Sequence, residues 1–338
     1  PATAHGLAVE AVSPDVTVAV EGDLVRVGRP SGLALSSPRV AGAAQPVDEL
    51  PAAALTPGLI DFEAWSRTGE GGFLPRYRRL QALASAEAAS GPDAPTTARL
   101  GLARFLVGSE LSYEAIGVLN ELSRRSPRAG SDPEVRALRA AARVMVGRHS
   151  EALVDLSTPG LAADRAAALW RGLAEAQQGQ WVEARRAFAE GANALEKFPP
   201  QWRLRFATAN ARAALELNDL PAARAAIFYA VEQGGPPVDL LQARLIQARL
   251  FEAEGDTDRA LRVYEAVGRA RFDGVATPAR LNAARLKLAK GRVTPAQAVR
   301  DIDSLRFRWR GDATELEVIR TLGQIYLDQG RYREALEA

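Results

Sequence analysis

From about residue 73 to the end of the chain, apolar and small residues recur every three to four positions. This spacing predicts a series of amphipathic helices. Leu74, Tyr77, Leu80 and Leu83 open the region and predict the buried face of its first helix. Prolines, Pro278 among them, fall between successive pairs of helices, where a helix must begin or end.

The first forty residues follow a different pattern. Val16, Val18 and Val20 alternate with smaller or polar residues, a period of two that favours a strand. A Glu-Gly-Asp turn follows, and extended structure resumes through Val27. Residues 1–40 are therefore predicted to be a β-hairpin segment, the fragment of a β-module.

Residues 41–72, rich in proline, alanine and glycine, predict a linker. Within it, Leu59 to Trp65 look like an apolar plug, and we expect them to dock on the first helices that follow. Residues 73–338 form the helical domain, which stops inside an amphipathic pattern, so its last repeat is truncated. We expect the chain to be a piece of a longer protein.

A small pattern recurs seven times in the helical domain, at intervals of 32 to 39 residues. Each copy has a small residue, a turn seven positions later, then an alanine; in the first six copies a large apolar residue follows four positions on, and the seventh ends before that position. The turns are Gly108, Gly147, Gly179, Asn218, Gly255, Gly291 and Gly330. The alanines are Ala115, Ala152, Ala184, Ala223, Ala260, Ala298 and Ala335. Ala115 and Ala298 lie seven positions after their turns rather than five, which indicates a two-residue insertion.

These residue types suit two antiparallel helices joined by a tight turn. Such helices approach closely only where side chains are small, and the large apolar residue fills the space against the next repeat. A repeat of this length predicts a solenoid, in which each unit contacts its neighbours.

The pattern resembles the tetratricopeptide repeat over about residues 95–338. The last unit matches most fully, with Leu322, Gly323, Tyr326, Gly330, Tyr332 and Ala335 at signature positions. Arg104, Arg143, Glu175 and Lys287 stand where that family usually has tyrosine, so their units are degenerate. The resemblance implies a mostly α fold, an α-solenoid of about seven helical hairpins, whose first helices line a groove for protein partners.

A fainter resemblance links residues 16–27 to AMIN-like β-modules of bacterial cell-envelope proteins. It implies a periplasmic or cell-envelope location, with the cytoplasm as the alternative. An ordinary surface hairpin is the competing interpretation.

Charge adds little. Forty-three basic residues, forty of them arginine, nearly balance forty-one acidic ones, and both signs are mixed throughout. We therefore do not expect a nucleic-acid binder, although the run from Arg306 to Arg310 around Trp309 could stack a base. More simply, that run connects two repeats, with arginine stems packed on aromatic rings. No apolar stretch is long enough to span a bilayer.

No catalytic, metal or cofactor site is predicted. The chain has no cysteine and two histidines, His5 in an end segment and His149 in a turn where we expect it to be solvated. Phosphate-binding and nucleophile-elbow motifs are absent. Asp256 and Asp258 follow a turn and are expected to cap a helix, whereas Asp301 and Asp303 lie two apart within a helix.

Projecting the first helices onto the expected groove gives the candidate partner-binding residues. They are Arg205, Arg212, Arg249, Arg285, Arg320, Leu169 and Leu173. Apolar residues lie toward the start and arginines toward the end, which suits an acidic or amphipathic segment of a partner. Alternatively, glutamates on neighbouring helices neutralise these arginines.

We therefore expect a non-catalytic scaffold or adaptor of a bacterial cell-envelope assembly, with the flagellar motor as one setting. The alternative is a regulatory or substrate-binding region of a larger enzyme.

Overall fold

A computed structural model describes residues 59–62, 65, 71–91, 94–310 and 313–338, and the backbone of four short strands before residue 29. The chain divides into two compact units, Pro1–Leu50 and Pro51–Ala338. The predicted linker, residues 41–72, lies mostly outside the described residues.

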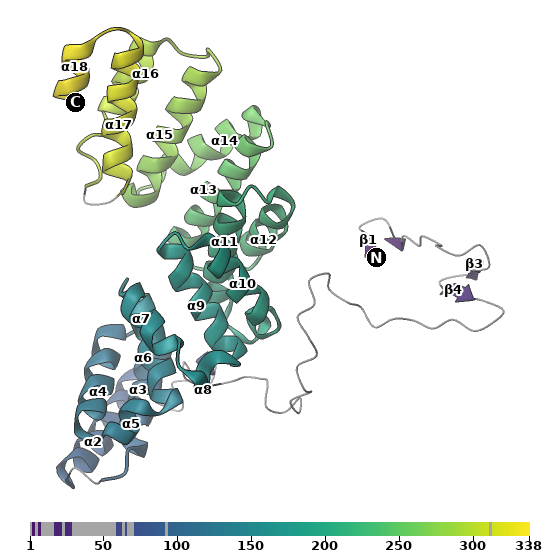
Figure 1. The fold of residues 1–338 in the computed structure, drawn as a ribbon. Coiled ribbons are helices and arrows are strands. Elements are labelled where there is room, and N and C mark those ends of the chain that lie inside the picture. Colours follow the sequence, from purple (N-terminus) through teal and green to yellow (C-terminus); the bar gives the residue numbers. More distant parts are fainter. Residues whose placement is uncertain are drawn as a thin grey trace. The chain divides into compact units, whose positions relative to one another are not determined.

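The second unit is a solenoid of seven consecutive helical hairpins (Figure 1). The hairpins are α3 (Thr97–Gly108) with α4 (Ser112–Arg125), α6 (Pro133–Met145) with α7 (His149–Leu156), α9 (Arg165–Gln177) with α10 (Trp181–Gly191), α11 (Pro200–Glu216) with α12 (Leu220–Glu232), α13 (Pro237–Ala253) with α14 (Thr257–Gly268), α15 (Asp273–Ala289) with α16 (Pro295–Asp303), and α17 (Ala313–Asp328) with α18 (Tyr332–Glu337). Before them, α2 (Phe73–Ala89) packs on α3. Short helices α5 (Pro127–Ser131), α8 (Pro159–Ala162) and η2 (Ala192–Lys197) lie in the connections. The predicted fold class and repeat are confirmed.

Most of the hairpin turns use the predicted residue in the left-handed conformation. Asn218 has φ 57°, and the glycines at the other turns lie between 65° and 82°, except at the first. There the prediction was wrong, because Gly108 ends α3 and Glu110 takes the left-handed position, with φ 59°. Ala115 then lies five residues after its turn like most of the others, so this hairpin has no insertion.

The close approaches between paired helices occur where the pattern predicted them. The alanines of the first six hairpins are fully buried, and so are most of the large residues four positions later. In α9, a Cβ on Gly172 would lie 3.1 Å from the ring of Phe188 in α10, so this crossing has no room for a larger residue.

Two details of the helices differ from the prediction. Pro278 lies inside α15 rather than between helices. The helix continues through it because Ala276, Ala279 and Leu281 are buried on both sides, and this packing outweighs one lost backbone hydrogen bond. In α2, Leu74 and Leu83 are exposed, since residues three apart drift by about 60° per step around a helix of 3.6 residues per turn.

The described residues of the predicted plug, 59–62 and 65, do pack on the solenoid, and the ring contacts of Phe62 lie beyond the helices that directly follow. Ile60, Phe62 and Trp65 are buried, and Phe62 contacts Trp170 of α9 and Trp202 of α11. Periodicity could not locate this contact, because it joins segments more than a hundred residues apart.

In the first unit, β1 (Ala2–Thr3) pairs antiparallel with β2 (Gly6–Leu7). Likewise β3 (Thr17–Glu21) pairs with β4 (Leu24–Gly28), and Val18 stands opposite Val27. The resemblance to an AMIN-like module stays a prediction.

Candidate partner-binding cavity

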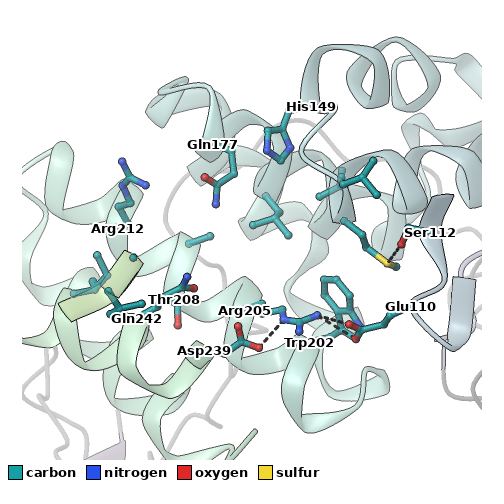
Figure 2. A pocket seen from close by; sticks show the side chains of 18 of the residues that line it. Glu110, Ser112, His149, Gln177, Trp202, Arg205, Thr208, Arg212, Asp239 and Gln242 are labelled. Atoms are coloured by element: carbon teal, nitrogen blue, oxygen red, sulfur yellow. Dashed lines mark hydrogen bonds and ion pairs between the residues drawn. The ribbon is translucent and has the colours of Figure 1, made fainter. Parts of the chain in front are cut away.

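The first helices α9, α11 and α13 form much of the wall of an open cavity of about 780 Å³ (Figure 2). The turn between α3 and α4, the end of α6 and the beginnings of α4, α7 and α15 complete it. We call it the Arg212 cavity. Its lining mixes apolar side chains, such as Leu173, with arginine, glutamine and carboxylate groups. This mixture can hold a peptide segment that has both apolar and charged side chains.

Arg205 of α11 ties together three elements around this cavity. Its Nε donates to Oδ2 of Asp239 at 2.7 Å, and its Nη1 donates to Oε1 of Glu110 at 3.1 Å. Its guanidinium also lies 4.4 Å from the ring centroid of Trp202, a cation–π contact. Figure 2 shows Arg205 between the two carboxylates. Its charge is therefore neutralised within the protein.

Arg212, two turns further along α11, is different. Among the described residues, no carboxylate lies within ion-pair distance of its guanidinium, and its buried Nε has no hydrogen-bond partner. It stacks over the ring of Trp181, 5.2 Å from the centroid. Burial, together with the nearby charge of Arg249, lowers the pKa of Arg212. This cation is therefore available to an anionic group that enters the cavity.

Three further lining residues carry buried polar atoms without a hydrogen-bond partner among the described residues. They are His149 (Nδ1), Trp202 (Nε1) and Thr208 (Oγ1). His149 was expected to be solvated, but it begins α7 and is half-buried in the cavity wall, and burial lowers its pKa. Unpartnered buried polar groups are uncommon in folded proteins. Their presence in one cavity indicates groups that can pair with a ligand.

The other candidate residues are placed outside this cavity, apart from Leu173 in its wall. Leu169 is buried against Gly191 of α10, on the core side of α9. Arg249 pairs with Glu216 at 2.9 Å, and Arg285 lies 3.7 Å from both Glu252 and Glu317. Arg320 is exposed. Carboxylates of the protein thus neutralise Arg205, Arg249 and Arg285, which is the alternative to partner binding that the sequence left open.

Sequence analysis missed several cavity residues. Thr208 lies between Arg205 and Arg212 on the same face of α11, so the projection that found those arginines could have found it too. Glu110 had no such signal, because it reaches Arg205 from 95 residues away.

The described residues contain no group of three or more His, Asp or Glu side chains that could hold a metal ion. Asp256 accepts from the amide of Arg259 and so caps α14 as predicted, while Asp258 pairs with Arg292. At the basic–aromatic run, the Arg306 and Arg310 guanidinium groups lie over the ring of Phe307, which is itself 71% exposed.

No protein-family model and no curated protein matches this sequence. Solved structures of similar fold include Cut9–Hcn1, a hetero-tetramer of the APC/C, with a TM-score of 0.52 and 12% identity over 78% of this chain. The match covers 48% of that longer chain. RapI in its apo form gives a TM-score of 0.50 at 12% identity, covering 71% of this chain and 73% of RapI. A tetratricopeptide repeat protein from Parabacteroides merdae gives 0.49 at 18% identity, covering 70% and 88% of the two chains.

The helical unit is thus a tetratricopeptide-like solenoid. Within the described part of the chain, no helix has both the length and the apolar character needed to cross a membrane.

Proposed function

We propose that this chain is a non-catalytic scaffold that binds a segment of a partner protein in the Arg212 cavity. The guanidinium of Arg212, which has no ion-pair partner among the described residues, carries the proposal. A half-buried cation of this kind, with Glu216 nearby but not in contact, gains from a ligand carboxylate that binds its planar fork through two hydrogen bonds. Leu173 in the same wall adds apolar area. The best-fitting ligand is an acidic side chain on an amphipathic segment.

The fold supports this assignment, because solenoids offer long surfaces made of successive repeats. Cut9, which is similar in fold, forms a hetero-tetramer with Hcn1. Arg205 has a different role, since its carboxylate partners already satisfy it and it holds the wall of the cavity.

Peptide binding to charge variants tests the proposal. Fluorescence anisotropy would compare short amphipathic peptides carrying glutamate with the same peptides carrying glutamine. We expect Arg212→Gln to lose the preference for glutamate, whereas Arg308→Gln, a change at an exposed arginine outside the cavity, keeps it. Equal binding of both peptides by the unaltered chain would count against the proposal.

The setting is proposed as well. The resemblance of residues 16–27 to AMIN-like modules supports a bacterial cell-envelope assembly, such as the flagellar motor, and a periplasmic location. Fractionating the native cells and detecting the protein with an antibody tests this setting. Recovery with the cytoplasmic proteins would contradict it.

A further inference from the structure

The described plug residues of segment 59–65 fill an aromatic socket made by Trp170 of α9, Phe198 before α11, and Trp202 and Phe206 of α11. The ring of Phe62 lies 5.4 Å from Trp202, 6.1 Å from Trp170 and 6.5 Å from Phe198 (centroid distances). Ile60 and Trp65 are buried beside it.

Backbone contacts give the plug a defined shape. The amide of Leu59 donates to Oδ2 of Asp164 at 2.6 Å, and the other oxygen of Asp164 caps α9 through the amide of Ala167. The amide of Trp65 donates to the carbonyl of Asp61 at 3.1 Å, which closes one turn of chain. The described part of the plug is therefore anchored through Leu59 to the N-terminal cap of α9.

The plug is not part of the hairpin repeat. In the three clusters that follow along the solenoid, every buried apolar residue comes from adjacent hairpins, as with Ile227 and Leu250. At the socket, the filling residue instead comes from more than a hundred positions earlier in the chain. Neighbouring repeats pack against each other, whereas this residue comes from a separate segment and fills a site, as a ligand does.

The fit between plug and socket is also incomplete. The indole nitrogens of Trp170 and Trp202 are buried, and neither has a hydrogen-bond acceptor among the described residues. Buried donors without acceptors cost free energy. The apolar side chains of the plug supply no acceptor for these donors. A ligand that did supply one would bind the socket more tightly than the plug does.

We propose that the socket is a peptide-binding site and that residues 59–65 are its tethered ligand, held reversibly. The site takes a short apolar turn with an aromatic side chain at the position of Phe62. A competing peptide of this pattern that also brings a carbonyl acceptor to the indoles would displace the plug. The site shares the side chain of Trp202 with the wall of the Arg212 cavity, but its ligand is the plug and its tests do not use Arg212.

Hydrogen exchange on the unaltered chain is the first test. If the plug leaves while the helices stay folded, the amides of Leu59 and Trp65 exchange through a local opening, faster by about 100-fold or more than the slowest amides of α9 and α11. Equal rates for plug and helices would overturn the proposal, because the plug would then be released only by unfolding.

Binding in trans is the second test. The full chain carrying Phe62→Ala and Trp65→Ala would be mixed with a labelled peptide of residues 57–67. We expect it to bind this peptide at least about 10-fold more tightly than the unaltered chain does, because a tethered segment competes at millimolar effective concentration. The same peptide with Phe62→Ala is the control and should not bind.

If the double variant melts cooperatively but binds no peptide, the proposal fails. If it does not fold, the exchange rates of the unaltered chain decide between the two outcomes, since that experiment needs no substitution.

Discussion

The Nη1 atom of Arg205 lies 3.1 Å from the carboxylate of Glu110, although the two residues are 95 positions apart. Glu110 occupies the turn of the first hairpin, and Arg205 lies on the first helix of the fourth. The same guanidinium pairs with Asp239 of the fifth. One arginine therefore links three hairpins at the wall of the Arg212 cavity, whereas the repeats pack mainly against their immediate neighbours.

Two substitutions at Glu110 separate its charge from its backbone conformation. Glu110→Ala and Glu110→Gly both remove the ion pair with Arg205, but only glycine adopts φ 59° without strain. We expect the glycine variant to be more stable than the alanine variant by about 1 kcal/mol. Urea unfolding of the two variants measures this difference. Equal stabilities would mean that the turn changes its conformation in the alanine variant.

Glycine-to-alanine changes should act in opposite directions at two helical positions. A Cβ on Gly191 would lie 2.7 Å from Leu169 and 2.9 Å from the carbonyl oxygen of Arg165, so Gly191→Ala should cost about 1–3 kcal/mol.

The matched control is Gly117→Ala, in α4. A Cβ there meets nothing within 4 Å, so this variant should gain about 0.5–1 kcal/mol from helix propensity. Thermal unfolding of both variants tests the pair. A gain at Gly191 would show that this crossing has more room than the geometry indicates.

Asp155 should be among the most sensitive polar positions of the solenoid. Its carboxylate is buried, and it accepts from Arg139 at 2.6 and 2.9 Å and from Arg143 at 2.6 Å. Asp155→Asn leaves the half-buried Arg139 without its counter-charge and leaves Arg143 only Glu151, at 3.4 Å, so it should cost about 3–5 kcal/mol of unfolding free energy.

Denaturant unfolding measures the loss at Asp155. Glu121→Gln is the control, because Glu121 pairs with Arg124 and Arg125 on the exposed face of α4. Exposed pairs add little stability, so this loss should be much smaller. Losses of equal size would show that burial of the ion pair has no special effect.

Glu175 should make stability depend on pH. Burial raises the pKa of its carboxyl above the ordinary value of 4.5, and its Oε2 has no hydrogen-bond partner among the described residues. A folded-state pKa above the unfolded value stabilises the fold below pH 4.5 and loses this effect as the pH rises through the folded-state pKa. At neutral pH the ionised carboxylate therefore opposes folding.

The variant Glu175→Gln removes this titration. We expect it to raise the melting temperature at pH 7 and to give a smaller gain at pH 4, where the carboxyl is mostly protonated in both states. Melts of the variant and the unaltered chain at the two pH values measure this. A gain of the same size at both would show that Glu175 does not titrate abnormally.

The helical repeat could be predicted from the sequence because it depends on the spacing and turn residues of short segments. Ala184 and Phe188 lie four residues apart on one helix face, and Gly179 supplies the left-handed turn before them, so one short segment contains the whole signal. Errors arose where local rules allow two outcomes. Glu110 carries no mark of a left-handed residue, and its contact with Arg205 comes from a distant hairpin.

The cavity was predicted less completely. Arg205, Arg212 and Leu173 were found from helix periodicity, since a first helix presents the same face at regular intervals. Periodicity cannot say which arginine is neutralised. That depends on carboxylates such as Glu110 and Asp239, which come from other hairpins.

Spacing along the chain was enough to establish the solenoid, its seven hairpins and the small residues at their crossings, because each hairpin is built from contacts within about 40 residues. Packing between distant segments of the chain decided the contacts of the candidate sites. It paired Arg205, left Arg212 without an ion-pair partner among the described residues, placed His149 half-buried in the cavity wall, and seated Phe62 between Trp170 and Trp202. These contacts join residues that no local pattern relates, and so they exist only once the hairpins have stacked.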